Sequence, residues 1–199
     1  MIGPQYGLLD LMRPRKGHFK LESGYHGELW LDLDSLFLRP RRLEPFVVEL
    51  ARRLSAHGVD AVCGPLEGGA FLAQMIASEL DREFFYSARS GPPRSEGLYT
   101  VGYRLPAMLR GAARGQRFAV VDDVVSAGSA VRGTIADLRA CGAEPVIAGA
   151  LLVLASSPAS GPTRLDLPLE RVEVLRSAMW APSECPRCAA LEPLENNFA

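Results

Sequence analysis

Short apolar runs alternate with amphipathic helical segments through the middle of this chain, and this alternation constrains the fold more than any other feature. Apolar residues recur at helical spacing before Gly58, at Leu43, Phe46, Val47, Leu50, Ala51 and Leu54. The pattern then predicts strands over 61–63, 84–86, 117–121 and 145–154, and helices over 71–80 and 130–141. Such alternation predicts an α/β fold with a central, mostly parallel sheet that is flanked by helices.

The two ends of the chain differ from this middle part. Residues 1–40 contain short polar and apolar alternations, and we predict a small N-terminal hood or lid subdomain there. Residues 41–180 form the predicted core, which ends with a short strand near 172–176. Residues 181–199 form a Pro-rich tail that contains a CxxC pair.

Composition and charge exclude several classes of protein. The chain has 199 residues and a net charge of −1, so neither nucleic acid nor a membrane surface is an expected partner. The one basic cluster, at residues 13–20, reads as a solvated turn. Lysine occurs only at Lys16 and Lys20, which excludes a Walker-type loop, a kinase-like strand lysine and a Schiff-base lysine deeper in the chain.

The expected compartment is the cytoplasm. The longest apolar stretch, 146–155, is about half of the roughly 20 residues that span a bilayer, and residues 1–11 lack a basic start and a signal-like core. Four cysteines in a chain of this length, without an export signal, indicate reduced thiols rather than a disulfide framework.

The segment 118–130, FAVVDDVVSAGSA, carries the clearest chemical signal. Apolar residues deliver the adjacent carboxylates Asp122 and Asp123 to the end of a strand, where an α/β sheet binds its ligand. The small side chains that follow leave backbone N–H groups free to surround an anion at the start of a helix. A phosphate beside two hydrogen-bond-accepting acids predicts a sugar phosphate as ligand.

This segment resembles the phosphoribosyl pyrophosphate (PRPP) signature of the type I phosphoribosyltransferases, and it implies their fold. The resemblance implies that Asp122 and Asp123 hold the ribose hydroxyls, and that residues 126–130 cradle the 5-phosphate. The implied PRPP-binding residues are Asp122, Asp123, Val124, Val125, Ser126, Ala127, Gly128, Ser129 and Ala130.

A second loop supports the same resemblance. The sequence CGPLEGGA, residues 63–70, lies between a predicted strand and a predicted helix, and it is similar to the pyrophosphate loop of that family. The resemblance implies that backbone amides of Pro65, Leu66, Glu67, Gly68 and Gly69 surround the pyrophosphate, and that Mg²⁺ arrives with PRPP. Proline has no N–H, so the amides of the other four residues carry this role.

Within the family, the orotate branch gives the nearest resemblance, over about residues 7–155. The sequence GHFKLESGYHG, residues 17–27, looks like that branch's N-terminal hood, which covers the base. The resemblance implies base contacts from Ser23, Gly24, His26 and Trp30. It also implies pyrimidine biosynthesis as the pathway and a homodimer as the assembly. For His26 a surface hydrogen-bonding role, and for Trp30 a core role, remain open alternatives.

The chain departs from the orotate branch at two places. The loop over 87–97 has neither the lysines nor the histidine of that branch, and its charged side chains include Arg89 and Arg94. We expect these arginines to act in catalysis together with Asp122 and Asp123, by neutralising pyrophosphate charge when the loop closes. The second departure is at residues 154–158, LASSP, where the branch has an Asp-Arg pair that meets the orotate carboxylate.

Two functional hypotheses follow. The first is a phosphoribosyltransferase that binds PRPP with Mg²⁺ and transfers the phosphoribosyl group to a nucleobase-like acceptor, which is of orotate type by resemblance although the two departures disfavour orotate itself. Glu22 adds a carboxylate to the predicted base site, which agrees with this choice of acceptor. The alternative is a PRPP-binding regulatory protein whose transfer activity is impaired.

Cys185 and Cys188 form a CxxC pair in the tail. One pair supplies two of the four ligands of a structural zinc, so a zinc site needs two more from Cys63, Cys141, a histidine or another subunit. The sequence alone favours a tail without zinc and leaves zinc binding as the alternative.

Overall fold

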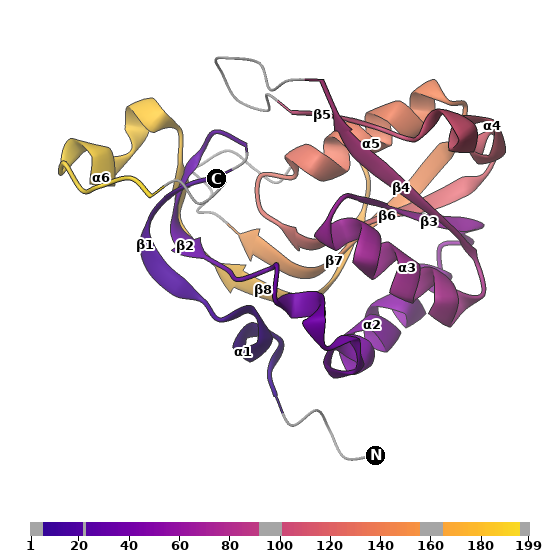
Figure 1. The fold of residues 1–199 in the computed structure, drawn as a ribbon, viewed down its shortest axis with the longest axis horizontal. Helices are drawn as coiled ribbons and strands as arrows, with labels where there is room; N and C mark the ends of the chain where they lie inside the picture. The colour runs from indigo at the N-terminus through magenta and orange to yellow at the C-terminus, as the bar shows by residue number, and fades with distance from the viewer. Residues whose placement is uncertain (1–5, 22, 92–100, 156–164, 196–199) are drawn as a thin grey trace.

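The computed structural model describes residues 6–21, 23–91, 101–155 and 165–195, and its centre is a six-stranded sheet (Figure 1). The strand order is β5-β4-β3-β6-β7-β8, and β5 alone is antiparallel to its neighbour. The strands are β3 (Ala61–Pro65), β4 (Glu83–Ser90), β5 (Gly102–Arg104), β6 (Arg117–Val125), β7 (Glu144–Ala155) and β8 (Leu169–Arg176). The predicted α/β fold with a mostly parallel sheet is confirmed.

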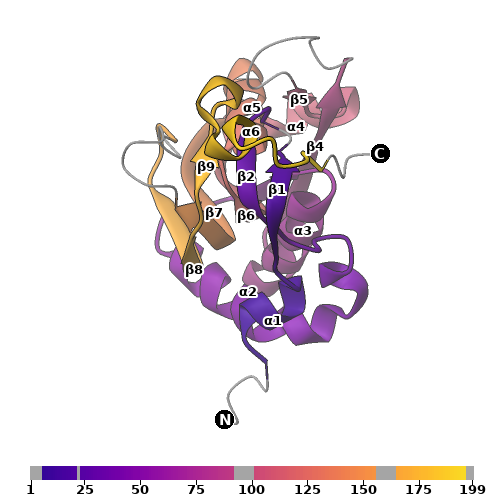
Figure 2. The ribbon, with the colours of Figure 1, turned by 90° about the vertical axis from the view of Figure 1, so that its left-hand side faces the viewer.

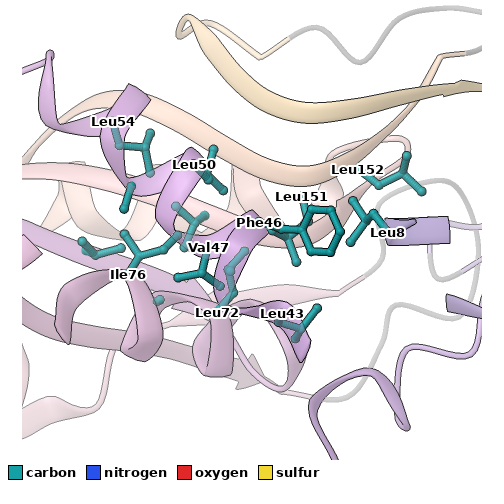
Figure 3. Packing of buried hydrophobic residues seen from close by; sticks show 14 of the residues in the cluster. Leu8, Leu43, Phe46, Val47, Leu50, Leu54, Leu72, Ile76, Leu151 and Leu152 are labelled. Atoms are coloured by element: carbon teal, nitrogen blue, oxygen red, sulfur yellow. The ribbon is translucent and has the colours of Figure 1, made fainter. Parts of the chain in front are cut away.

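Helices cover both faces of this sheet. On one face α2 (Pro40–Ser55) and α3 (Gly68–Leu80) pack against the strands together with α1 (Leu8–Met12). Figure 3 shows the contact, in which Phe46, Leu50 and Leu54 of α2 lie among Leu8, Leu72, Leu151 and Leu152. The other face is covered by α5 (Ser129–Ala140), with a second apolar cluster that includes Phe118, Ile135 and Leu138.

The predicted strands and helices all form, with ends that differ by a few residues. The helix expected over 71–80 begins at Gly68, and the strand expected over 84–86 extends to Ser90. Strand β5 and the short helix α4 (Arg110–Ala113) were not predicted, because elements of three or four residues are too short to show a period. Three single-turn 3₁₀ helices, at 36–38, 107–109 and 182–184, were not predicted either.

The hood is a separate three-stranded antiparallel sheet, and both ends of the chain contribute to it. Strands β1 (Arg15–Lys20) and β2 (His26–Trp30) form a hairpin, and β9 (Met179–Trp180) adds to the edge of β2. Figure 2 shows α6 (Pro186–Ala189), from the tail, beside this hairpin. Residues 179–180, which belong to the predicted core segment 41–180, pair with β2 of this sheet.

None of the helices in the described residues is long and apolar enough to cross a membrane.

Candidate active site

The site lies at the carboxyl ends of β3 and β6, where the connections of the sheet diverge. From β3 the chain passes through α3 to β4 on one side, and from β6 it passes through α5 to β7 on the other. Neighbouring strands whose connections leave in opposite directions open a crevice outside their carboxyl ends, where open α/β sheets bind ligands. Both motifs found in the sequence, 65–69 and 122–130, lie in this crevice.

The glycines after β3 bring the backbone of the first loop against the acid pair. A Cβ atom at Gly68 would lie 2.0 Å from Oδ2 of Asp123, and one at Gly69 would lie 2.6 Å from Oδ1 of Asp122. A side chain at either position would therefore displace the acids. The peptide bond between Leu66 and Glu67 is cis.

The two acids differ in their surroundings. Asp123 is 6% exposed, and its Oδ1 accepts a hydrogen bond from Val124 N at 2.7 Å. Burial raises the pKa of Asp123 to about 6, and the charge of Asp34 acts in the same direction, against hydrogen bonds that lower it. Asp122 is half-buried, and its Oδ1 accepts a hydrogen bond from Asp123 N at 3.2 Å. The pair thus offers one half-buried carboxyl group and one buried carboxyl group whose pKa is raised toward neutral pH.

The second loop leads into helix α5, whose N-terminus faces the cavity. Gly128 precedes the helix with φ 72°, a left-handed conformation that favours glycine. Arg132 Nη2 donates to Ala127 O at 2.7 Å and holds the loop from within the helix. The first backbone N–H groups of a helix have no intrahelical partner and carry partial positive charge, so this loop can bind a phosphate.

A cavity of about 580 Å³ joins these loops. The predicted PRPP residues on its wall are Asp122, Asp123, Val124, Ser126, Ala127, Gly128, Ser129 and Ala130. The predicted pyrophosphate residues on its wall are Pro65, Leu66, Glu67 and Gly68. Val125 and Gly69 do not line the cavity: Val125 is 1% exposed in the core, and Gly69 is buried in the first turn of α3.

Only some of the residues predicted in the hood and in the segment 87–97 lie on the wall of the cavity. Ser23, Trp30 and Arg89 line the cavity, Arg89 from the end of β4. Gly24 and His26 do not line it, and the ring of His26 contacts His18 instead. The predicted positions of Arg94 and Glu22 lie outside the described residues, as do residues 156–158 of the segment that replaces the Asp-Arg pair.

The hydroxyl of Ser23 has an unusual position. The residue is 4% exposed and lines the cavity, and its Oγ has no hydrogen-bond partner within the described residues. A buried hydroxyl without a partner costs free energy, about 1–3 kcal/mol. A ligand in the cavity can offset this cost by supplying the partner.

Three polar residues on the wall were not predicted from the sequence. Asp32 and Asp34 enter from the segment after β2, and Tyr103 enters from β5. Asp32 is engaged locally: hydrogen bonds from Ser35 hold its pKa below the usual range, and Arg13 lies 3.5 Å away. The Asp-x-Asp spacing was visible in the sequence, but only the fold brings it opposite residues 122–130.

The family model for the phosphoribosyl transferase domain matches residues 44–172, and the chain belongs to this family. This range contains both loops and five of the six central strands in full, with β8 reaching four residues beyond it. The cavity at the carboxyl ends of β3 and β6, with its two loops, therefore belongs to a phosphoribosyltransferase fold, as the resemblance implied.

Within this family, the chain is similar in sequence to proteins named orotate phosphoribosyltransferase. An orotate phosphoribosyltransferase of Caldanaerobacter subterraneus subsp. tengcongensis is 29% identical over 90% of this chain and 87% of its own length. One from Thermotoga maritima is also 29% identical, over 90% of this chain and 89% of its own length. The chain is thus similar to orotate phosphoribosyltransferases along nearly its whole length.

Solved structures share the fold. Orotate phosphoribosyltransferase from Aeropyrum pernix matches with a TM-score of 0.57 at 21% identity, over 81% of this chain and 88% of its own. Adenine phosphoribosyltransferase from Thermoanaerobacter pseudethanolicus matches with a TM-score of 0.64 at 18% identity, over 83% of this chain and 96% of its own. Proteins named for two different bases thus share this fold, so the fold alone does not choose the acceptor.

Proposed function

We propose that this protein is a PRPP-dependent phosphoribosyltransferase whose acceptor is a nucleobase-like heterocycle other than orotate. One observation carries the proposal: a glycine loop, an acid pair and a helix N-terminus from two neighbouring strand ends face a single cavity. A sugar that carries phosphate groups at two positions needs these three elements together.

Each element has a part in the proposed reaction. The backbone N–H groups of 126–130 hold the 5-phosphate, the acids accept hydrogen bonds from the ribose hydroxyls, and the backbone of 66–68 faces the pyrophosphate. A ring nitrogen of the acceptor forms a bond to ribose C1, and the bond from C1 to the pyrophosphate oxygen breaks with its electron pair leaving on the pyrophosphate. The proton displaced from the ring nitrogen passes to the departing pyrophosphate. The protein contributes by positioning the reactants and stabilising charge.

The acid pair also fits Mg²⁺, which we propose as the metal that accompanies PRPP. Asp122 is half-buried on the cavity wall, and carboxylate oxygens together with water are ligands that Mg²⁺ prefers. Mg²⁺ neutralises phosphate charge when it is bound there. Arg89 adds the one guanidinium among the described lining residues, and it interacts with the departing pyrophosphate.

The charges of the cavity support an acceptor without a carboxylate. Its described lining contains five carboxyl groups, from Asp32, Asp34, Glu67, Asp122 and Asp123, and a single guanidinium. A carboxylate on the base would approach like charges there, which is unfavourable in a partly buried site. The Ser23 hydroxyl favours an acceptor with a polar edge, and Trp30 adds an aromatic wall.

The test is a screen of purine, pyrimidine and pyridine bases, orotate included, with PRPP and Mg²⁺, in which nucleotide and pyrophosphate formation are both measured. We expect turnover with a neutral base at ordinary enzyme rates, roughly 1–10³ per second. Equal or faster formation of orotidine monophosphate would overturn the choice of acceptor and leave the reaction class intact.

A PRPP-binding regulatory protein is the second candidate. The observation in its favour is the segment 87–97, which has no lysine or histidine that could donate a proton. The same screen separates the two functions: PRPP binding by calorimetry without turnover on any base supports the regulatory role. The homodimer implied by the resemblance stays a prediction, which sedimentation velocity checks.

A further inference from the structure

Four metal-ligating side chains meet outside the cavity, between the hood and the tail. They are His18 and His26 from the hairpin and Cys185 and Cys188 from the tail, and one ligand atom of each lies within 4.8 Å of all the others. His18 Nε2 lies 3.2 Å from His26 Nδ1, 3.3 Å from Cys185 Sγ and 3.7 Å from Cys188 Sγ. Cys188 Sγ lies 3.3 Å from His26 Nδ1.

We propose that these four residues bind one structural Zn²⁺ that fastens the C-terminal tail to the hood. The distances fit a tetrahedron around this ion. Zn–N bonds of about 2.0–2.1 Å and Zn–S bonds of about 2.3 Å place neighbouring ligands about 3.3 Å apart for N···N and about 3.6 Å apart for N···S. The site does not depend on the phosphoribosyl transfer proposed above.

Hydrogen bonds alone do not explain this convergence. His18 Nδ1 lies 3.0 Å from the backbone oxygen of Glu192, which can only accept, so in the neutral ring Nδ1 carries the proton and Nε2 presents a lone pair. A single in-plane lone pair cannot be directed at three separate donors, yet three ligand atoms surround Nε2 within 3.7 Å. A common cation satisfies all four atoms at once. The bond to Glu192 also orients the ring in the way that outer hydrogen bonds orient metal-bound histidines.

The chemistry of the set favours zinc. Two thiolates and two imidazoles form a closed set of nitrogen and sulfur ligands, which is typical of structural zinc and leaves no open position for a substrate. His18, His26 and Cys185 are each at most 6% exposed. The two cysteines flank the start of α6, and the CxxC spacing lets one short turn supply both sulfur atoms.

The proposed zinc site lies next to a turn that lines the cavity, so the metal would help to position that turn. Leu21 and Ser23 lie in the turn between the two histidines, and both line the cavity. The tail already contacts the hairpin, because Lys20 N donates to Glu195 O at 2.9 Å and Glu195 N donates to His18 O at 2.8 Å. A metal that joins residues about 160 positions apart would fix this turn over the acceptor end of the cavity.

The first measurement is the metal content of tag-free protein, expressed in zinc-supplemented medium and purified with a phosphine reductant and no chelator. We expect about one zinc per chain in the wild type, and loss of most of it in Cys188→Ser and His26→Asn. Cys141→Ser and His57→Asn are matched controls, because neither residue belongs to the cluster, and they should keep the metal. Zinc retained equally in all four variants would overturn the assignment.

The second measurement uses the wild type alone, so it does not depend on whether the variants fold. Metal-free wild type titrated with Co²⁺ should develop the visible bands of tetrahedral cobalt and a near-ultraviolet thiolate-to-cobalt band, and Zn²⁺ should remove both. Folded wild type that contains no zinc and shows no such spectrum would overturn the proposal. PRPP binding, measured on the same samples, reports on the proposed function separately.

Discussion

The two sides of the cavity are built in different ways. On the sheet side, residues 65–68 and 122–130 follow directly from strands β3 and β6, which the central sheet holds on both edges. On the hood side, the lining residues come from the turn and strand β2 of a small hairpin and from the segment that follows it, and this hairpin is completed by Met179–Trp180 and by the tail. The sheet side is held by paired strands on both edges, whereas the hood side depends on contacts between distant parts of the chain. We therefore expect the sheet side to set PRPP affinity and the hood side to set the acceptor.

The largest effect is expected from Gly68→Ala on the sheet side. The new Cβ would lie 2.0 Å from Asp123 Oδ2, so either the loop or the acid must move. PRPP affinity should fall about 100-fold or more, since hydrogen bonds to charged groups contribute about 1.5–3 kcal/mol each and several would be lost. Calorimetry measures this. Gly111→Ala is the matched control, because a Cβ there meets nothing within 4 Å, and unchanged affinity in both variants would remove the loop from the site.

Asp123→Asn should weaken PRPP binding and stabilise the fold. Loss of the charge should reduce affinity about 10- to 100-fold. The pKa of Asp123 is raised from 3.8 to about 6 in the folded protein, so between these values the folded state binds more protons and its stability falls as pH rises. Above pH 6 the buried, ionised carboxylate therefore lowers the free energy of unfolding by about 3 kcal/mol. The uncharged amide of the variant avoids this loss.

Urea unfolding at several pH values checks this second effect. The variant should be the more stable protein at pH 7.5, and its advantage should shrink as the pH falls toward 4. Equal stability at pH 7.5 would show that the carboxyl is not buried as described.

Much of the sheet side could be predicted from the sequence, and little of the hood side could. The acid pair and its loop are contiguous, so one stretch of 13 residues, 118–130, defines both the strand end and the anion loop. His26 illustrates the limit on the hood side. Its sequence neighbours indicated the base site, whereas its structural neighbours are His18 and Cys188, the latter 162 positions away. No local sequence pattern encodes a contact between residues so far apart. Strand β9, which brings the C-terminal segment beside β2, has only two residues and is too short to be predicted from periodicity.

Arg89→Ala should have a smaller effect, because Arg89 is exposed at the edge of the cavity. We expect kcat/KM to fall about 10-fold with PRPP affinity nearly unchanged, as for a contact that strengthens while the pyrophosphate leaves. Steady-state kinetics measures this effect. Arg104→Ala on the neighbouring strand β5 is the matched control, and equal losses in the two variants would point to general charge instead.

The smallest effect is expected from Ser23→Ala on the hood side. The variant removes a buried hydroxyl that lacks a partner within the described residues, so the empty protein should be as stable as the wild type or slightly more so. The KM of the acceptor should rise about 3- to 10-fold, for loss of one hydrogen bond, while PRPP affinity stays unchanged. If PRPP affinity changed and the KM of the acceptor did not, the hood side would contact PRPP and the assignment of the two sides would be wrong.

Titration of PRPP with Mg²⁺ into the wild-type protein, followed by calorimetry, tests the central claim most directly. The claim is that the sheet side of the cavity is a PRPP site. We expect one binding event per chain, with a dissociation constant in the micromolar range and affinity lost in Gly68→Ala but kept in Gly111→Ala. Absence of binding by the folded wild type at millimolar PRPP would contradict the claim.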